Sequence, residues 1–363
     1  MPDPKPPPPS REAAAWSLLL DRLSRRDAVA QVQTQGNVFA ALSAEPSGTV
    51  RGFRLQRAIR RRIEACQGAA VGLLCRGEAG WPERLSAIPD APALLHYRGD
   101  LRALERTAIA IVGSRRASRA GLNLAESLAQ DLGRIGVVVV SGLALGVDSA
   151  AHRGALGADA VTLAVLGSGV DRVTPVSNTP LARDVLAGGG LLVSEYPPGA
   201  PAAPFHFPER NRLIAGLSLG VVVVEASARS GSLITARCAG EQGREVMAMP
   251  ATPGLPNAAG SNRLLKQGAA LVENAEDVLA ALGRDLSVPG ADGAGAAADL
   301  SSALTPELAR VLDRLDASAQ SLDSLAARTG LDAQACAVAL TELEIGGFVQ
   351  RLTDGYIRRL SGY

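Results

Sequence analysis

A strand, a turn and a helix follow one another in the first third of the chain, and the polar groups of the turn favour a phosphate ligand. The apolar run Ala108–Val112 has the length and branching of a buried parallel strand. Gly113, Ser114 and Arg115 follow it directly, and a helical pattern begins shortly after them. Backbone N–H groups, a hydroxyl and a guanidinium are thereby offered to one point, which suits an anion. A plain strand–helix connection is the alternative, because every α/β unit needs such turns.

The same turn and the scattered metal-ligating residues give no sign of a cofactor. No second or third glycine follows Gly113 at the spacing of the dinucleotide fingerprint, so an NAD site is not supported. The 4 cysteines lack Cys-x-x-Cys spacing and the 3 histidines are dispersed. We therefore expect no cofactor, no metal site and no disulfide framework.

Other polar residues follow the predicted strands, at the edge where ligands of open α/β sheets gather. The candidates for binding are Ser141, Gly142, Arg229, Ser230, Gly231 and Ser232. The turn at 230–232 can offer N–H groups to an anion. Glu195 and Glu225 could form a general acid/base pair or could equally anchor loop amides. No nucleophile has a matched base, so a positively biased, phosphate-sized groove is better supported than an active site.

The segment 205–216, which we expect to be a loop, interleaves arginines with aromatic residues. Its candidate binding residues are Phe207, Arg210, Asn211 and Arg212. Guanidinium groups for the backbone and a ring for a base suit single-stranded nucleic acid. An alternative is that Phe205 and Phe207 simply fill the core.

Apolar and helical patterns alternate between residues 67 and 285. They predict an α/β fold with a doubly wound parallel sheet covered on both faces. The strand candidates are Val71–Leu74, Ile109–Val112, Val137–Ser141, Val161–Leu166, Leu191–Ser194, Val221–Glu225, Glu245–Ala248 and Leu271–Val272. Helical patterns between them include Leu122–Ile135, Asp148–Leu156 and Ser232–Gln242.

Shorter segments flank this central part. We predict a disordered Pro-rich lead (1–9), a helical domain (10–66), a Gly/Ala linker (286–300) and a winged-helix domain (301–363). The last would consist of helices at 305–316, 321–329 and 332–345 and a hairpin of 348–352 and 355–360.

Charge is unevenly distributed although the net charge is only +1. Residues 10–64 hold 10 basic and 5 acidic side chains, whereas residues 301–363 hold 6 basic and 8 acidic ones. A polyanion is therefore expected on the N-terminal side. Arg54, Arg57 and Arg61 share one helical face, which could lie along phosphates or be a solvated basic surface.

Apolar residues form 47% of the chain, enough for a large core, and aromatic residues 3%, too few for a broad base-stacking platform. No uncharged apolar stretch is long enough to span a bilayer, and the proline-rich start is unlike a signal peptide. We expect a cytoplasmic protein without membrane association.

Seven segments together resemble the DprA (Smf) family of DNA-processing proteins. They are Ile-Val-Gly-Ser-Arg (111–115), Ser-Gly-Leu-Ala-Leu-Gly-Val-Asp-Ser-Ala-Ala-His (141–152), Leu-Gly-Ser-Gly-Val-Asp (166–171), Ser-Glu-Tyr-Pro-Pro-Gly (194–199), Phe-Pro-Glu-Arg-Asn-Arg-Leu-Ile-Ala-Gly-Leu-Ser (207–218), Glu-Ala-Ser-Ala-Arg-Ser-Gly-Ser-Leu-Ile-Thr-Ala (225–236) and Gly-Ser-Asn-Arg-Leu-Leu (260–265). The resemblance covers residues 70–280, and so many segments in order make it specific. Helical N-terminal (SAM or helix-hairpin-helix-like) and winged-helix C-terminal additions also occur in this family.

The resemblance implies a non-enzymatic protein with an extended Rossmann-like domain that binds single-stranded DNA and forms a homodimer. Such a protein protects incoming DNA and helps to load the RecA recombinase during natural transformation. Carried over by motif, Gly113, Ser114 and Arg115 would hold a backbone phosphate. Arg210, Arg212 and Lys266 would add flanking positive charge.

Three residues depart from the family pattern. Leu145 and Glu209 stand where basic residues are usual, and Thr174 replaces a common tyrosine. DNA affinity could therefore be lower or be shared with the N-terminal arginines. The predicted recognition helix of the winged helix, 332–347, contains no Lys or Arg, so duplex reading is not expected there and a protein contact is more credible.

The competing function is an enzyme. The Rossmann variant also resembles the lysine-decarboxylase-like hydrolases of nucleoside monophosphates, in which Glu195, Glu225 and Arg229 would be the relevant groups. Their Pro-Gly-Gly run with a following acidic residue is replaced here by residues 229–236, which include no carboxylate. Hydrolysis is therefore not expected.

Overall fold

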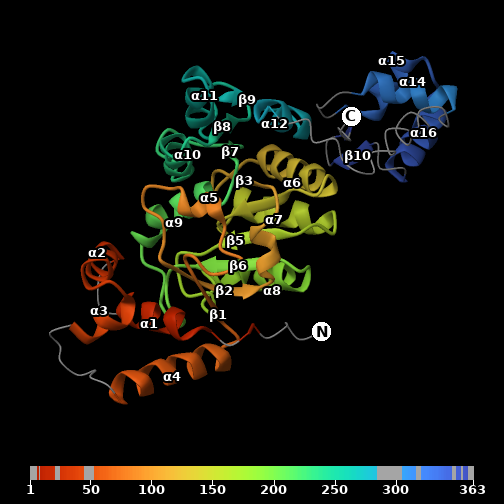
Figure 1. Ribbon diagram of the computed structural model, residues 1–363. Helices are drawn as coiled ribbons and strands as arrows, with labels where there is room; N and C mark the ends of the chain where they lie inside the picture. The colour runs from red at the N-terminus through yellow and green to blue at the C-terminus, as the bar shows by residue number, and fades with distance from the viewer. Residues whose placement is uncertain are drawn as a thin grey trace. The chain divides into compact units, whose positions relative to one another are not determined.

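The computed structural model forms two compact units, Met1–Asp285 and Leu286–Tyr363 (Figure 1). It describes residues 6–7, 9–20, 25–44, 53–283, 305–315, 320–345, 349–352 and 355–358. Most of the predicted Pro-rich lead and all of the predicted linker (286–300) lie outside the described residues.

A nine-stranded sheet runs through the described part of the first unit, in the order β1-β2-β6-β5-β4-β3-β7-β8-β9. Its strands are β1 (Gly72–Cys75), β2 (Leu94–Gly99), β3 (Ala108–Val112), β4 (Val138–Ser141), β5 (Thr162–Val165), β6 (Leu191–Ser194), β7 (Gly220–Val223), β8 (Glu245–Ala248) and β9 (Ala270–Leu271). From β6 to β9 every neighbouring pair is parallel. The predicted α/β fold with a Rossmann-like sheet is confirmed.

The β1–β2 end of the sheet differs from the prediction. The Val71–Leu74 candidate becomes β1, which pairs antiparallel with β2, and β2 in turn pairs antiparallel with β6. β2 was not predicted, because His96 and Arg98 interrupt its apolar run. The sheet is thus mixed rather than wholly parallel.

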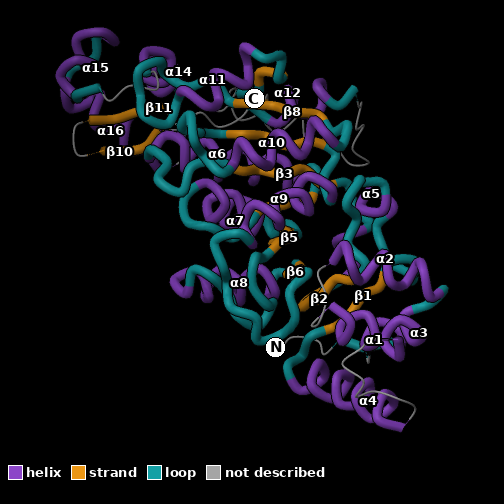
Figure 2. The backbone as a smooth tube through the Cα atoms, turned by 90° about the vertical axis from the view of Figure 1, so that its left-hand side faces the viewer, coloured by secondary structure: helices purple, strands orange, loops and turns teal. Residues whose placement is uncertain are grey.

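Helices cover both faces of the sheet (Figures 1 and 2). They are α5 (Glu83–Ser86), α6 (Arg119–Arg134), α7 (Val147–Gly157), α8 (Thr179–Ala187), α9 (His206–Gly216), α10 (Ser232–Glu241), α11 (Ala259–Lys266) and α12 (Ala275–Ala281), with the 3₁₀ turns η1 (Leu101–Leu104) and η2 (Val176–Asn178). Val140 on one face packs in the cluster that contains Leu213 of α9. Leu192 on the other face packs in the cluster that contains Leu181 of α8. This alternation explains why the central strands are apolar at every position.

The segment expected to be a loop at 205–216 is helix α9 instead. Pro208 lies in its first turn, where the missing N–H breaks no helical hydrogen bond. Leu213 and Ile214 are 1% exposed, and the polar residues before them are also buried. The run of polar residues at 209–212 therefore belongs to a largely buried helix.

Four N-terminal helices pack against the β1–β2 end of the sheet (Figure 1). They are α1 (Arg11–Leu20), α2 (Arg25–Gln35), α3 (Val38–Ala44) and α4 (Phe53–Gly68). Leu19 and Ile59 share one apolar cluster with Leu73 of β1 and Leu94 of β2. The helical segment therefore has a continuous core with the sheet, and a domain boundary at residue 66 stays a prediction.

The described part of the second unit contains three helices and a hairpin, the arrangement predicted for a winged helix. The elements are α14 (Pro306–Arg314), α15 (Leu322–Thr329), α16 (Ala333–Ile345), β10 (Val349–Leu352) and β11 (Gly355–Arg358). The two strands are antiparallel. Gly330, in the left-handed region at φ +71°, ends α15 at the predicted turn.

Candidate functional site

The turn between β3 and α6 is built tightly into its surroundings. Ser114 donates its N–H to the carbonyl oxygen of Glu225 at 2.7 Å and accepts a hydrogen bond from the N–H of Val147 at 3.2 Å. A Cβ at Gly113 would lie 2.6 Å from Cγ2 of Val147. Only glycine fits there, so the backbone path that leads to Arg115 is fixed.

The Glu225 carboxylate anchors this turn. It accepts hydrogen bonds from the N–H of Ser118 at 2.8 Å and from the hydroxyl of Ser118 at 2.5 Å. The same hydroxyl accepts from the N–H of Gly121 at 3.0 Å and caps α6. Of the two roles considered for Glu225, the structure supports the anchor rather than an acid or base.

Arg115 and Phe207, which are far apart in the sequence, meet at the carboxyl edge of the sheet. Cζ of Arg115 lies 5.0 Å from the centroid of the Phe207 ring, within the range of a cation–π interaction. Arg115 is exposed, and no carboxylate of the described residues forms an ion pair with it. Its charge is therefore available to an anion.

Further rings gather beside Phe207, and sequence reasoning missed two of them. The rings of Tyr196 and His206 stack with centroids 3.8 Å apart, and Phe205 meets His206 edge-on at 4.5 Å. Phe205 is 63% exposed. A signal existed, because Tyr196 lies in the motif at 194–199 and His206 stands between two phenylalanines.

Ser141 and Gly142 shape the site from within rather than facing a ligand. The Ser141 hydroxyl is buried and donates to the carbonyl oxygen of Ile111 at 2.7 Å. The N–H of Gly142 donates to the Asp148 carboxylate at 3.1 Å. A Cβ at Gly142 would lie 2.2 Å from Nη1 of Arg210, so a larger residue would have to displace this guanidinium.

Arg210 is buried, at 4% exposure, and donates a hydrogen bond to the carbonyl oxygen of Val165. Burial lowers the pKa of Arg210 to about 10, and the nearby Asp148 carboxylate opposes that shift. Burial raises the pKa of Asp148, against the attraction of Arg210. Arg210 thus stays protonated at neutral pH as part of an internal network.

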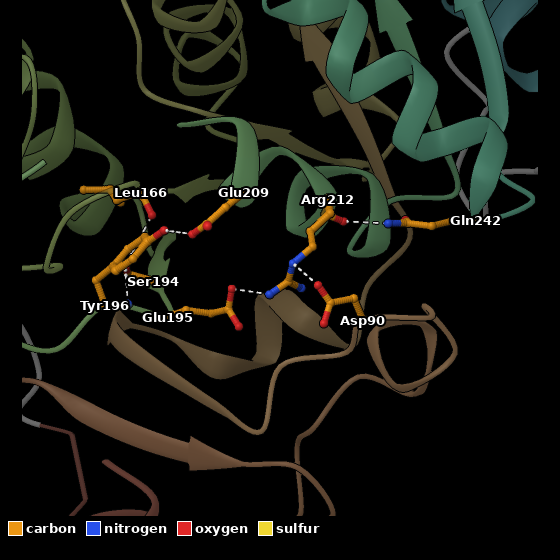
Figure 3. Close-up of polar contacts among 8 residues, drawn as sticks. All are labelled: Asp90, Leu166, Ser194, Glu195, Tyr196, Glu209, Arg212 and Gln242. Carbon is orange, nitrogen blue, oxygen red and sulfur yellow. Dashed lines mark hydrogen bonds and ion pairs between the residues drawn. The ribbon is translucent and has the colours of Figure 1, made fainter. Parts of the chain in front are cut away.

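Arg212 is enclosed by carboxylates (Figure 3). It donates from Nη2 to Glu195, and its Nε lies 3.5 Å from an oxygen of Asp90. Its carbonyl oxygen accepts a hydrogen bond from Gln242 at 3.0 Å. Arg212 is 8% exposed, so the positive charge expected to flank a ligand is neutralised inside the protein.

Of the remaining predicted binding residues, Asn211 and the turn at 230–232 are in contact with each other. Asn211 donates to the carbonyl oxygen of Gly231 at 3.2 Å, and the hydroxyls of Ser230 and Ser232 lie 2.8 Å apart. Arg229 and Lys266 are exposed. Lys266 lies in the last turn of α11.

The two departures at usually basic positions have different environments. Leu145 is 48% exposed before α7, so an apolar side chain faces solvent there. Glu209 accepts a hydrogen bond from the Tyr196 hydroxyl at 2.8 Å (Figure 3). The Tyr196 ring in turn stacks on His206.

Within the described ranges, no His, Cys, Asp and Glu side chains cluster in a way that could hold a metal ion. None of the described helices has the length and apolar character needed to cross a membrane.

Two family models match the chain. DNA recombination-mediator protein A matches residues 72–283, more than half of the chain, and the DprA winged helix domain matches residues 295–355.

Curated relatives and solved structures agree with these matches. Protein Smf of Escherichia coli is 40% identical over 280 residues, which cover 77% of this chain and 75% of that protein. DNA processing protein DprA of Streptococcus pneumoniae is 46% identical over 202 residues, 55% of this chain and 70% of that protein. Its X-ray structure aligns with a TM-score of 0.61 at 34% identity over 73% of this chain and 97% of that chain. DNA processing protein A of Helicobacter pylori, whose structure describes a single-stranded DNA binding mode, aligns with a TM-score of 0.53 at 29% identity over 59% of this chain and 96% of that chain.

Proposed function

The chain belongs to the DNA recombination-mediator protein A (DprA) family, and we propose that it is a DNA-processing protein. It binds single-stranded DNA at the carboxyl edge of its sheet. The observation that carries this proposal is the unpaired, exposed guanidinium of Arg115 above the Phe207 ring. A cation and a ring at one place match the backbone and the base of a single strand.

In this proposal the turn of Gly113, Ser114 and Arg115 holds a backbone phosphate. The fixed turn presents Arg115. The rings of Tyr196, Phe205 and His206 beside Phe207, here called the ring cluster, offer surfaces to unstacked bases. Base–aromatic stacking does not depend on a particular base, so little sequence preference is expected. Arg229 and Lys266 add exposed positive charge, whereas Arg210 and Arg212 support the site from inside.

We further propose the biological role that the family membership suggests. The protein would protect incoming single strands, form a homodimer through its Rossmann-like domain and help to load RecA in the cytoplasm during natural transformation. The names of the curated relatives, DNA processing protein DprA, support the assignment to DNA processing.

The structure gives the hydrolase alternative little support. The two carboxylates considered for catalysis are both engaged, Glu225 with Ser118 and Glu195 with Arg212. We therefore propose a binding protein rather than an enzyme.

The test is a titration of the protein with labelled single-stranded and duplex oligonucleotides of equal length at several salt concentrations. Single strands should bind more tightly, with a linear decrease of log K with log salt, because phosphate contacts release counterions. A nucleotide-release assay on nucleoside monophosphates should show no product. Equal or tighter duplex binding would overturn the proposal, and release of a base would revive the enzyme.

A further inference from the structure

Helix α4 carries a row of arginines that the site above does not use. Arg57, Arg60 and Arg61, here called the α4 arginine row, are all exposed. No carboxylate within the described ranges forms an ion pair with any of the three. The opposite side of the helix buries Ile59 in the N-terminal core.

The placement of this row works against the stability of the helix. Arg57 is three residues from Arg60 and four from Arg61, the two spacings at which like charges on a helix repel. The first turn of α4 has no acidic residue, and Glu64, four residues after Arg60, is the one carboxylate at helical spacing from the row. A polyanion along this face would relieve the repulsion.

A chain of contacts connects α4 with the ring cluster. The next residue, Arg62, donates from Nη1 to the Ser17 hydroxyl at 3.0 Å. That hydroxyl lies 3.3 Å from Nε2 of His96, which pairs in register with Ser194 at the carboxyl end of β6. Ser194 is two residues before Tyr196. Both views of the backbone place α4 beside α1 at the β1 end of the sheet (Figures 1 and 2).

We propose that the α4 arginine row is a second phosphate-binding segment for the same strand of DNA that binds at Arg115 and Phe207. A strand that leaves the ring cluster at Tyr196 continues toward the N-terminal helices and lies with its backbone along α4. The contact is to phosphate alone, because guanidinium groups bind the backbone of any sequence. This inference rests on the proposed function and adds a length requirement: only a strand longer than the central site reaches α4.

The experiment compares the triple variant R57A/R60A/R61A with the wild type on oligo-dT of about 10 and about 60 nucleotides, the first within and the second well above the roughly 4–16 nucleotides that one binding site covers. With the long strand the affinity should fall on the order of tenfold at low salt. The salt slope should decrease by about 2, from three contacts of about 0.7 each. With the short strand both values should stay within about twofold of the wild type.

The matched control R134A/R153A/R183A removes the same charge from three exposed arginines on α6, α7 and α8 and should leave binding of both strands nearly unchanged. The variant R57K/R60K/R61K keeps the charge and should retain most of the affinity for the long strand. Circular dichroism verifies that each variant is folded.

Equal losses at both lengths or the same loss in the control would overturn the inference. Wild-type binding of both strands with an unaffected triple variant would remove this inference and leave the proposed function standing. Failure of the wild type to bind either strand would remove both.

Discussion

Arg115 and Arg212 were expected to serve one basic surface, yet they lie in opposite environments. Arg115 is exposed above an aromatic ring and has no carboxylate partner among the described residues. Arg212 is 8% exposed and held between Glu195 and Asp90. The first guanidinium is available to a ligand, whereas the second already has its counter-ions.

The difference shows that an arginine-rich motif has to be divided by environment before roles are assigned. A buried, paired arginine holds elements together. Its removal leaves a carboxylate buried without its counter-ion. An exposed, unpaired arginine costs little to remove but provides the charge that a phosphate binds.

The largest effect is expected from Arg212→Ala. Glu195 would lose the guanidinium of Arg212 in a mostly buried position, so the free energy of unfolding should fall by about 3–5 kcal/mol. Arg115→Ala should change it by less than about 0.5 kcal/mol. Urea unfolding of both variants measures this contrast. Equal losses of stability would show that the two arginines do not differ in their structural role.

Acid tests the buried network separately from the exposed Arg115, because two buried histidines lie next to buried or half-buried arginines. Burial lowers the pKa of His152 and of His96 from 6.5 to about 3, and the positive charges of Arg210 and Arg62 respectively act in the same direction. The unfolded chain takes up these protons near pH 6.5 and the folded chain does not. Stability is therefore complete above about pH 6.5 and should fall below it by about 1.4 kcal/mol per pH unit for each histidine.

Urea unfolding between about pH 7 and pH 5 measures this slope. His152→Gln, which cannot be protonated, should remove about half of it. A slope that the variant leaves unchanged would show that other groups cause the acid sensitivity.

A smaller loss is expected from Gly146→Ala. Gly146 has φ +81°, and a Cβ there would lie 2.2 Å from the carbonyl oxygen of Ser114. We expect a loss of about 1–3 kcal/mol and weaker single-strand binding, because the turn before Arg115 would move. Gly240→Ala is the matched control, since Gly240 lies inside helix α10 and nothing lies within 4 Å of the added atom. Similar losses in both variants would contradict this account of the turn.

The smallest effect is expected from truncation near Gly290. The described exposed face of α16 includes Glu342 and Glu344 and no basic residue, so it should repel a phosphate backbone. Removal of the second unit should leave affinity for a labelled single strand within about twofold. A tenfold loss, about 1.4 kcal/mol, would show that the winged helix holds DNA.

Much of the sheet could be predicted from the sequence, because strands buried on both faces leave continuous apolar runs such as Ala108–Val112 and Val138–Ser141. β2 could not, since a strand near the sheet edge tolerates His96 and Arg98. The sequence predicts a loop where α9 forms, because the charged residues of this helix are buried by tertiary contacts that do not show in the local periodicity.

The candidate site could be predicted only as a set of segments. The motif with Arg115 and the motif with Phe207 were both found, but their contact joins residues more than ninety positions apart. The burial of Arg212 depends on Asp90 and Glu195, carboxylates from distant segments that no local pattern connects to it. Tertiary partners, rather than residue types, decide which arginine is free.

A salt titration of Arg115→Ala shows whether Arg115 is a phosphate contact for single-stranded DNA. Arg183→Ala is the matched control, because Arg183 is exposed on α8 and forms no ion pair with the described residues. We expect weaker binding by Arg115→Ala with a salt slope reduced by about 0.7–1, an intact fold and an unchanged control. Affinity equal to that of the wild type at every salt concentration would contradict it.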